Sequence, residues 1–321
     1  MQENILDDLL QKELIAPDDA LKIRHFESAR PFSLHWELTI LLYLGVLLLN
    51  AGLGFLIYEN IDSIGHVVLI TAIGLVSAGC FAYAIWRRQP FSFGEVKSST
   101  PYYDYILLLG CLTFLLMEGY WQFQYQIFGT RYGLATLIPM LLFFFVAYRF
   151  DNRAVLSLAI TAMASWLGMT VTSNKLLSDN DFSSQAVVTT GLFLGAFLSA
   201  VPFISEHFGF KKHFSLTYLN FGAHLLMISC LAGMMALDES LIYFPLLCLS
   251  VGFYLWYART RHSFYFLTVA VIYGYIGITY LLIKAADNFP AEFYLTYFVL
   301  SCIGVILFLT QYKRFFKNKT A

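Results

Sequence analysis

The sequence is poor in charge. Asp, Glu, Lys and Arg make up 13% of its 321 residues, about half the share found in an average soluble domain. Hydrophobic residues reach 59%, which is more apolar surface than one water-soluble core of this size could bury. Basic and acidic residues nearly balance, at 20 against 21, and this argues against a nucleic-acid-binding protein. Low charge combined with 18% aromatic residues also excludes a disordered chain.

Motifs of soluble enzymes are absent as well. The sequence contains no GxxxxGK[ST], GxGxxG, HExxH, CxxC or GxSxG pattern, so it gives no sign of ATP hydrolysis, nicotinamide binding, zinc hydrolysis or a serine nucleophile elbow. The five cysteines lie singly inside apolar runs, which favours packing over metal ligation or disulfide bonds. We therefore predict no cofactor and no metal site. A non-enzymatic protein is favoured, although catalysis within the membrane stays open.

What the chain does contain is long apolar runs. A helix needs about 20 mostly apolar residues to cross a hydrocarbon core about 30 Å thick, whereas strands of a β-barrel would alternate in polarity. Ten segments meet the helical standard, and together they predict an all-α, polytopic transmembrane helical bundle of about ten spans. The segments are residues 38–58, 66–86, 104–122, 133–149, 154–173, 186–204, 216–237, 241–257, 264–283 and 293–312.

The distribution of basic residues predicts the orientation of this bundle. If the N-terminus is cytoplasmic, 17 Lys and Arg residues fall on the cytoplasmic side, and only Arg131, Lys175 and Lys284 fall outside. An excess of basic residues in cytoplasmic loops orients membrane proteins, so both termini are expected in the cytoplasm and the protein in a bacterial cytoplasmic (inner) membrane. The expected organisation is a cytosolic amphipathic helical segment at 1–35, a transmembrane bundle at 36–312 and a basic cytosolic tail at 313–321.

Residues 3–27 have the pattern of two short amphipathic helices. Ile5, Leu6, Leu9 and Leu10 form an apolar stripe on the first of them. Seven acidic residues against four basic ones up to position 30 argue against a DNA-binding helix-turn-helix, so no nucleic acid is expected as a partner. Two interpretations remain for this segment, namely a cap on the helix bundle or a docking site for a partner protein. The lipid bilayer is the other expected partner.

The same segment carries a family resemblance. The pattern Leu9-Leu10-Gln11-Lys12-Glu13-Leu14-Ile15, then Asp19-Ala20 and Ile23, precedes a block of hydrophobic spans joined by short basic turns. It resembles a bacterial family of multi-spanning membrane proteins that is catalogued only as a domain of unknown function. The resemblance implies a multi-pass architecture behind a short N-terminal helical segment. It implies no catalytic residue, because that family has no established activity.

A row of polar residues enters the seventh span. His213, Thr217, Asn220 and His224 are spaced by four, three and four residues, which places them on one face of a helix. Ionisable groups in hydrocarbon cost at least about 2.5–3.5 kcal/mol, so the row needs an explanation. It either lines a cavity facing the cytoplasm, with His224 as a proton or ligand site, or it forms hydrogen bonds between helices.

Two further places stand out in the sequence. Glu118 lies in the outer half of the third span, where it reaches the interface, pairs with another helix, or serves as a proton or cation site. His66, at the outer start of the second span, is a candidate neighbour. Residues 121–127 alternate apolar and polar types, which predicts an extended outer segment or an aromatic belt. In the sixth span, Gly191, Gly195 and Ser199 share one face and predict close helix packing.

Three functions are compatible with these features. A small-solute or ion transporter or channel would use the polar row of the seventh span, together with Glu118. A structural or regulatory membrane subunit would dock a partner through residues 3–27. An intramembrane lipid-modifying enzyme would use Glu118 and His66 on the outer side.

Overall fold

The computed structural model describes residues 19, 35–98, 100, 102–129, 132–178, 184–286 and 290–312. Within this part of the chain there is no strand, and ten helices are long and apolar enough to cross a membrane. The predicted fold class is therefore confirmed. Apart from Asp19, the segment expected at residues 3–27 lies outside the described residues, and so does the tail at 313–321.

The chain divides into two compact units, Met1–Gly52 and Leu53–Ala321. Helix α3 (His35–Ile64) begins in the first unit and ends in the second. Within the first unit its large side chains are mostly exposed, for example Leu41 and Leu48, each 62% exposed. A helix surface with so many exposed apolar side chains is unfavourable in water and is favoured in contact with lipid.

The second unit contains the remaining helices. They coincide with the predicted second to tenth spans, and the largest difference at an end is in α7, which runs on to Ser178. The helices are α4 (His66–Trp86), α5 (Tyr103–Tyr125), α6 (Tyr132–Phe150), α7 (Arg153–Ser178), α8 (Gln185–Phe208), the short 3-10 turn η1 (Lys212–Phe214), α9 (Ser215–Met235), α10 (Ser240–Arg261), α11 (Phe264–Ala285) and α12 (Ala291–Thr310).

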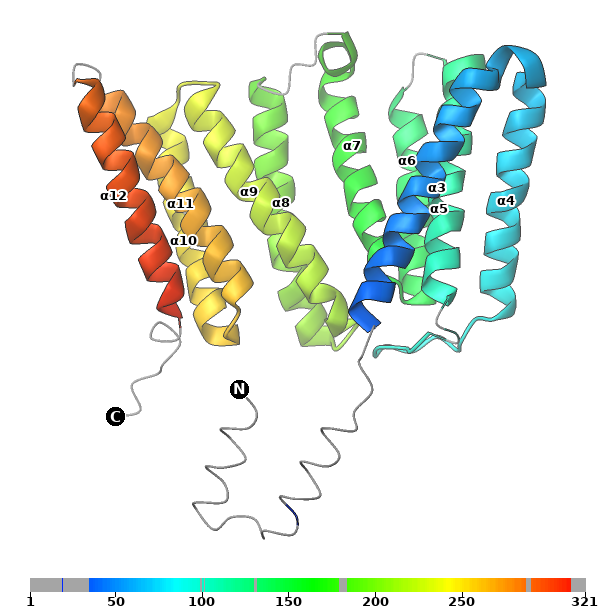
Figure 1. The fold of residues 1–321 in the computed structure, drawn as a ribbon, viewed down its shortest axis with the longest axis horizontal. Helices are drawn as coiled ribbons and strands as arrows, with labels where there is room; N and C mark the ends of the chain where they lie inside the picture. Colours follow the sequence, from blue (N-terminus) through cyan, green and yellow to red (C-terminus); the bar gives the residue numbers. More distant parts are fainter. Residues whose placement is uncertain are drawn as a thin grey trace. The chain divides into compact units, whose positions relative to one another are not determined.

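Helices that follow one another in the sequence pack as pairs, namely α4 with α5, α6 with α7, α8 with α9, and α10 with α11. Two buried apolar clusters hold the pairs together. The first runs from α4 to α9 and includes Leu107 and Phe143, and the second runs from α8 to α11 and includes Met227 and Tyr254. Because α8 and α9 contribute to both clusters, this pair lies between the two cores, as Figure 1 shows.

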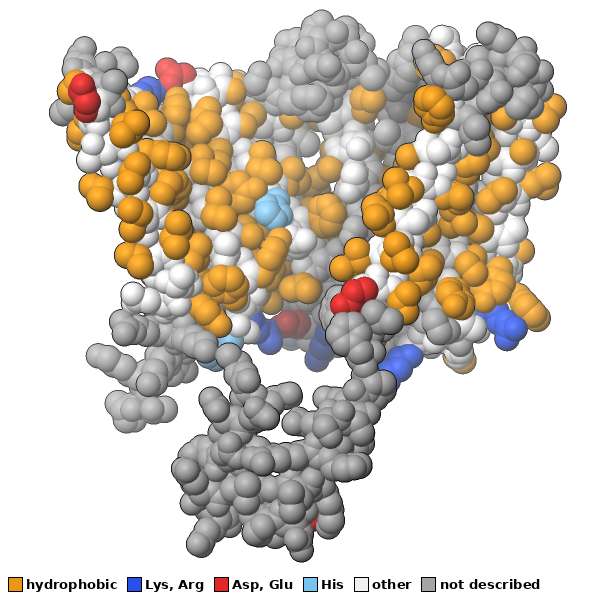
Figure 2. Space-filling view, in the orientation of Figure 1, with side chains coloured by type: hydrophobic (Ala, Val, Ile, Leu, Met, Phe, Trp, Pro, Cys, Tyr) orange, Lys and Arg blue, Asp and Glu red, His pale blue; other side chains and the backbone are white. Residues whose placement is uncertain are grey.

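The lateral surface of the second unit is apolar, and most of its described basic residues gather at one end. Figure 2 shows apolar side chains over the visible face and most of the visible Lys and Arg side chains along its lower edge. These basic residues come from the turns α4–α5, α6–α7, α8–α9 and α10–α11, which share one end because successive helices alternate in direction. We call it the basic end, and the other the opposite end. An apolar belt between polar ends is the form of an integral membrane protein.

The structure corrects the expectation of an extended segment at residues 121–127. Helix α5 continues to Tyr125, so the alternating pattern there does not reflect a strand. The Gln122 side chain stabilises the turn that follows this helix. Its Nε2 donates a hydrogen bond to Gly129 O (3.0 Å), and its Oε1 accepts one from the backbone N–H of Phe128 (2.9 Å). The interpretation of these residues as an aromatic belt is compatible with the helix.

Candidate functional site

His224 of α9 is bound to α11 through both of its ring nitrogens. Its Nδ1 lies 2.9 Å from the hydroxyl oxygen of Tyr273, and its Nε2 lies 2.9 Å from that of Tyr265. The Tyr265 hydroxyl in turn donates a hydrogen bond to Oδ1 of Asn220, one turn before His224 on α9. We call Asn220, His224, Tyr265 and Tyr273 the α9–α11 polar cluster.

The hydrogen bonds of this cluster have one consistent direction. A tyrosine hydroxyl has a single proton, and Tyr265 uses it toward Asn220. Its oxygen must then accept a hydrogen bond from Nε2–H of His224, which leaves Nδ1 as an acceptor for the hydroxyl of Tyr273. A neutral imidazole satisfies this order completely, because it has one donor and one acceptor. The chain of donors therefore runs from Tyr273 through His224 and Tyr265 to Asn220.

The α9–α11 polar cluster reaches from the middle of the membrane toward the basic end. His224 lies near the centre of α9, while Tyr265 is the second residue of α11. The spacing of eight positions from Tyr265 to Tyr273 corresponds to about 12 Å along a helix. The cluster is not enclosed, because Tyr265 is 44% exposed and His224 is only half-buried. It can therefore exchange hydrogen bonds, or a proton, with a group beside the helices.

The predicted row on the seventh span is only partly reproduced. Asn220 and His224 do meet in one cluster, whereas Thr217 is half-buried without a described hydrogen bond to it. His213 is not on α9 at all, because Lys211 adopts a left-handed conformation (φ 47°) and the chain enters α9 only after η1. The row is therefore interrupted at its basic end.

Glu118 and His66 have separate surroundings in the described structure, with no hydrogen bond or ion pair between them. The Glu118 side chain is 6% exposed, and its Oε1 is buried with no hydrogen-bond partner in the part of the chain that the structure describes. His66 instead lies with its Nδ1 2.7 Å from the hydroxyl oxygen of Tyr120. Glu118 and Tyr120 are two residues apart on α5 and so point to different faces of the helix. The structure describes no hydrogen bond between Glu118 and its candidate neighbour His66.

A second polar centre lies at the basic end, where Asp151, Lys211 and His213 form a buried triad. The carboxylate of Asp151 is 3.1 Å from Nζ of Lys211 and 2.5 Å from Nε2 of His213. The side chains of Asp151, Lys211 and His213 are 3%, 2% and 9% exposed. Burying charges costs free energy unless they are paired and hydrogen-bonded, so this triad must hold its geometry closely.

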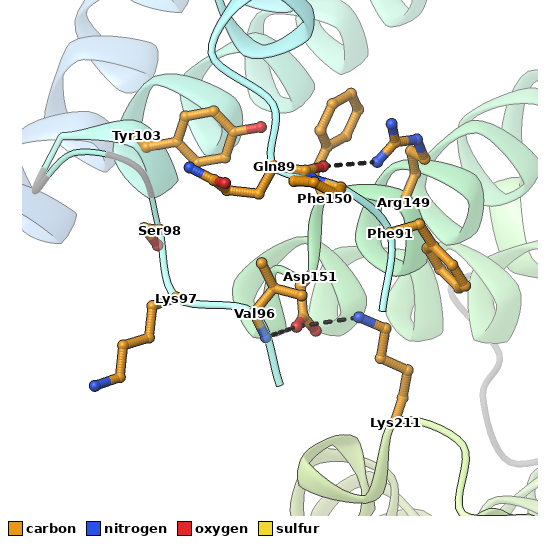
Figure 3. A pocket seen from close by; sticks show the side chains of 11 residues that line it. Gln89, Phe91, Val96, Lys97, Ser98, Tyr103, Arg149, Phe150, Asp151 and Lys211 are labelled. Carbon is orange, nitrogen blue, oxygen red and sulfur yellow. Dashed lines mark hydrogen bonds and ion pairs between the residues drawn. The ribbon is translucent and has the colours of Figure 1, made fainter. Parts of the chain in front are cut away.

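The α4–α5 connection completes the triad. The backbone N–H of Val96 donates to Oδ2 of Asp151 at 2.5 Å, as Figure 3 shows. The backbone N–H of Lys211 donates to Phe93 O at 2.7 Å, and its Nζ donates to Gly94 O at 3.3 Å. Three connections, α4–α5, α6–α7 and α8–α9, are thus tied together at one end of the bundle.

A small pocket lies beside the buried triad. Its cavity volume of about 20 Å³ has room for a water molecule and not for a metabolite. Among all the residues that the structure describes, no group of three or more His, Cys, Asp or Glu side chains could hold a metal ion. The triad is therefore better explained as an anchor than as a binding site. The pocket is lined by Gln89, Pro90, Phe91, Val96, Lys97, Ser98, Tyr103, Arg149, Phe150, Asp151 and Lys211.

Comparison with known proteins supports the architecture and assigns no activity. A family model described as "Predicted membrane protein (DUF2157)" matches residues 7–156, which confirms the family resemblance over that stretch. No curated protein and no solved structure matches the chain. The matched stretch includes Glu118 and Asp151 but ends before the α9–α11 polar cluster. The family match therefore says nothing of that cluster, and its role is argued from its geometry.

Proposed function

We propose that this integral membrane protein, whose residues 7–156 match an uncharacterised membrane-protein family, is a transporter or channel for a small solute or ion. The α9–α11 polar cluster is the place where the solute, or a proton that moves with it, contacts the protein. The observation that carries the proposal is His224, which is hydrogen-bonded at both ring nitrogens near the middle of a membrane-spanning helix. Ionisable groups at this depth mark functional sites more often than packing sites.

The direction of the hydrogen-bond chain supports a role in proton movement. An imidazole can take up a proton at Nδ1 and release one at Nε2, and in this cluster Nε2 faces Tyr265, toward the basic end. Packing alone needs no such group, because α9 and α11 both contact α10 and share the apolar cluster around Tyr254. An interhelical hydrogen bond in a membrane adds only about 0.6 kcal/mol, which is small against the cost of placing a histidine there.

The full-length protein in sealed proteoliposomes tests the proposal. With a trapped pH-sensitive dye and a potassium diffusion potential, we expect proton flux that His224→Gln reduces by roughly 100-fold, the low end of the effect of a positioned proton-transfer group. Tyr265→Phe should reduce the flux in the same direction. The matched control is His207→Gln, at the C-terminal end of α8 and away from the cluster. Absence of flux through the unaltered protein, or equal flux through His224→Gln, would contradict the proposal.

The alternative of a partner-docking subunit depends on residues 3–27, which lie outside the described residues except for Asp19. No contact of this segment that would support a docking function is therefore described.

A further inference from the structure

We infer that Glu118 is a proton-binding site inside the membrane, separate from the α9–α11 polar cluster. Glu118 is a residue of α5 and is 94% buried. Its Oε1 has no hydrogen-bond partner among the described residues. The inference stands on this burial and on the absence of a counter-charge in the described part of the chain. It does not depend on the transport proposal.

The position of Glu118 along α5 keeps it away from both aqueous phases. Helix α5 begins at Tyr103, at the basic end, and Glu118 follows about 22 Å further along at 1.5 Å per residue. About 10 Å of helix then remain before α5 ends at Tyr125. An ionised carboxylate at such a depth is far more costly than the neutral acid. The carboxyl group therefore needs either a cationic partner or a proton.

No cationic partner is present in the described surroundings. The helices packed against α5 are α4, α6 and α7, and the basic residues Arg149 and Arg153 of α6 and α7 lie at the basic end. In the halves of these helices nearer the opposite end, His66 is the one titratable side chain that the structure describes. Its Nδ1 faces the hydroxyl of Tyr120, 2.7 Å away. Among the residues that the structure describes, an ionised Glu118 would thus have no counter-charge.

A metal cation is a poorer occupant than a proton. Hard cations require about six oxygen ligands, but the nearest polar side chains along α5 are already engaged. Gln122 is bonded at both ends of its amide to the backbone of the following turn, and the Thr113 hydroxyl is bonded to backbone carbonyls of α5. A single proton satisfies the carboxylate without further ligands. Because Glu118 is nearer the opposite end, that proton exchanges with the aqueous phase there.

A hydrophobic carbodiimide tests this occupancy directly. Dicyclohexylcarbodiimide reacts with the protonated acid: the carboxyl oxygen bonds to the carbodiimide carbon, the proton moves to a nitrogen, and an acyl shift then gives an N-acylurea that retains every atom of both reactants. The full chain would be treated in membranes near neutral pH and its peptides analysed by mass spectrometry. We expect the adduct on Glu118, its loss in Glu118→Gln, and little reaction of Glu118 with a water-soluble carbodiimide.

Asp151 is the matched control, because it is also buried but is ion-paired with Lys211 at 3.1 Å, and it should remain unmodified. An unmodified Glu118 under the hydrophobic reagent would overturn the inference, as would equal modification by the water-soluble one. Infrared difference spectra between the native chain and Glu118→Gln provide an independent measurement. The native chain should show the carbonyl band of a neutral carboxylic acid that the variant lacks, and carboxylate bands in its place would also overturn the inference.

Discussion

Asp151→Asn is expected to lower the free energy of unfolding by about 3–5 kcal/mol, the cost of removing one partner from a buried ion pair. The substitution leaves the ammonium group of Lys211, which is 2% exposed, without a counter-charge. Backbone strain does not contribute, because Asp151 has φ 60° and asparagine tolerates the left-handed region well. The expected loss therefore reports the missing charge and the missing acceptor oxygen, because both carboxylate oxygens of Asp151 accept hydrogen bonds.

Unfolding of the purified protein by SDS titration in detergent micelles measures this loss. Glu95→Gln is the matched control, because Glu95 pairs with Arg153 at 2.8 Å while 60% exposed, and exposed pairs contribute at most about 1 kcal/mol. Adding Lys211→Met to Asp151→Asn should recover part of the stability, because it removes the orphaned charge. If Asp151→Asn cost no more than Glu95→Gln, the triad would not be the anchor of the basic end.

Gly195→Ala is expected to destabilise the protein by about 1–3 kcal/mol, the usual cost of overpacking. A Cβ at Gly195 of α8 would lie 2.5 Å from the backbone nitrogen of Leu226 in α9 and 2.8 Å from its Cα. Backbone atoms cannot rotate away as a side chain can, so the two helices must separate. This separation would disturb the one helix pair that contributes to both apolar cores.

The control for Gly195→Ala is Gly252→Ala in α10, where an added Cβ meets nothing within 4 Å. Alanine is the better helix former by about 1 kcal/mol, so Gly252→Ala should leave stability unchanged or raise it. SDS titration of both variants gives the comparison. Equal stability of the two variants would show that α8 and α9 do not meet as closely as the structure places them.

Features determined locally were predictable from the sequence. The length and uniform polarity of each apolar run are properties of about 20 consecutive residues, so the ten spans were predicted close to their observed bounds. The spacing of Gly191, Gly195 and Ser199 likewise predicted that this face of α8 packs closely against another helix, although not which one. In the structure the partner is α9, where a Cβ added to Gly222 would lie 2.5 Å from the Ser199 hydroxyl oxygen. Small residues at four-residue spacing carry this signal because they let two backbones approach.

Features that depend on distant residues were not predictable. Asp151 and Lys211 are 60 positions apart and looked like ordinary charges of two basic turns, although an acidic residue between Arg149 and Arg153 was a signal. Tyr265 and Tyr273 are two of 21 tyrosines, and no sequence pattern distinguished them from the others as partners of His224. Helical periodicity alone also placed His213 on α9, since the positive φ of Lys211 has no sequence signature comparable to a glycine.

The membrane topology is tested by the accessibility of single cysteines in a chain whose five native cysteines are replaced. Arg88→Cys and Lys212→Cys place a thiol at the basic end, and Lys284→Cys places one at the end of α11 on the opposite side. In sealed, oriented bacterial vesicles, a membrane-impermeant maleimide should reach the first two only from the cytoplasmic face and the third only from the other face. Labelling of all three from the same face would contradict a chain that crosses the bilayer ten times with its basic turns in the cytoplasm.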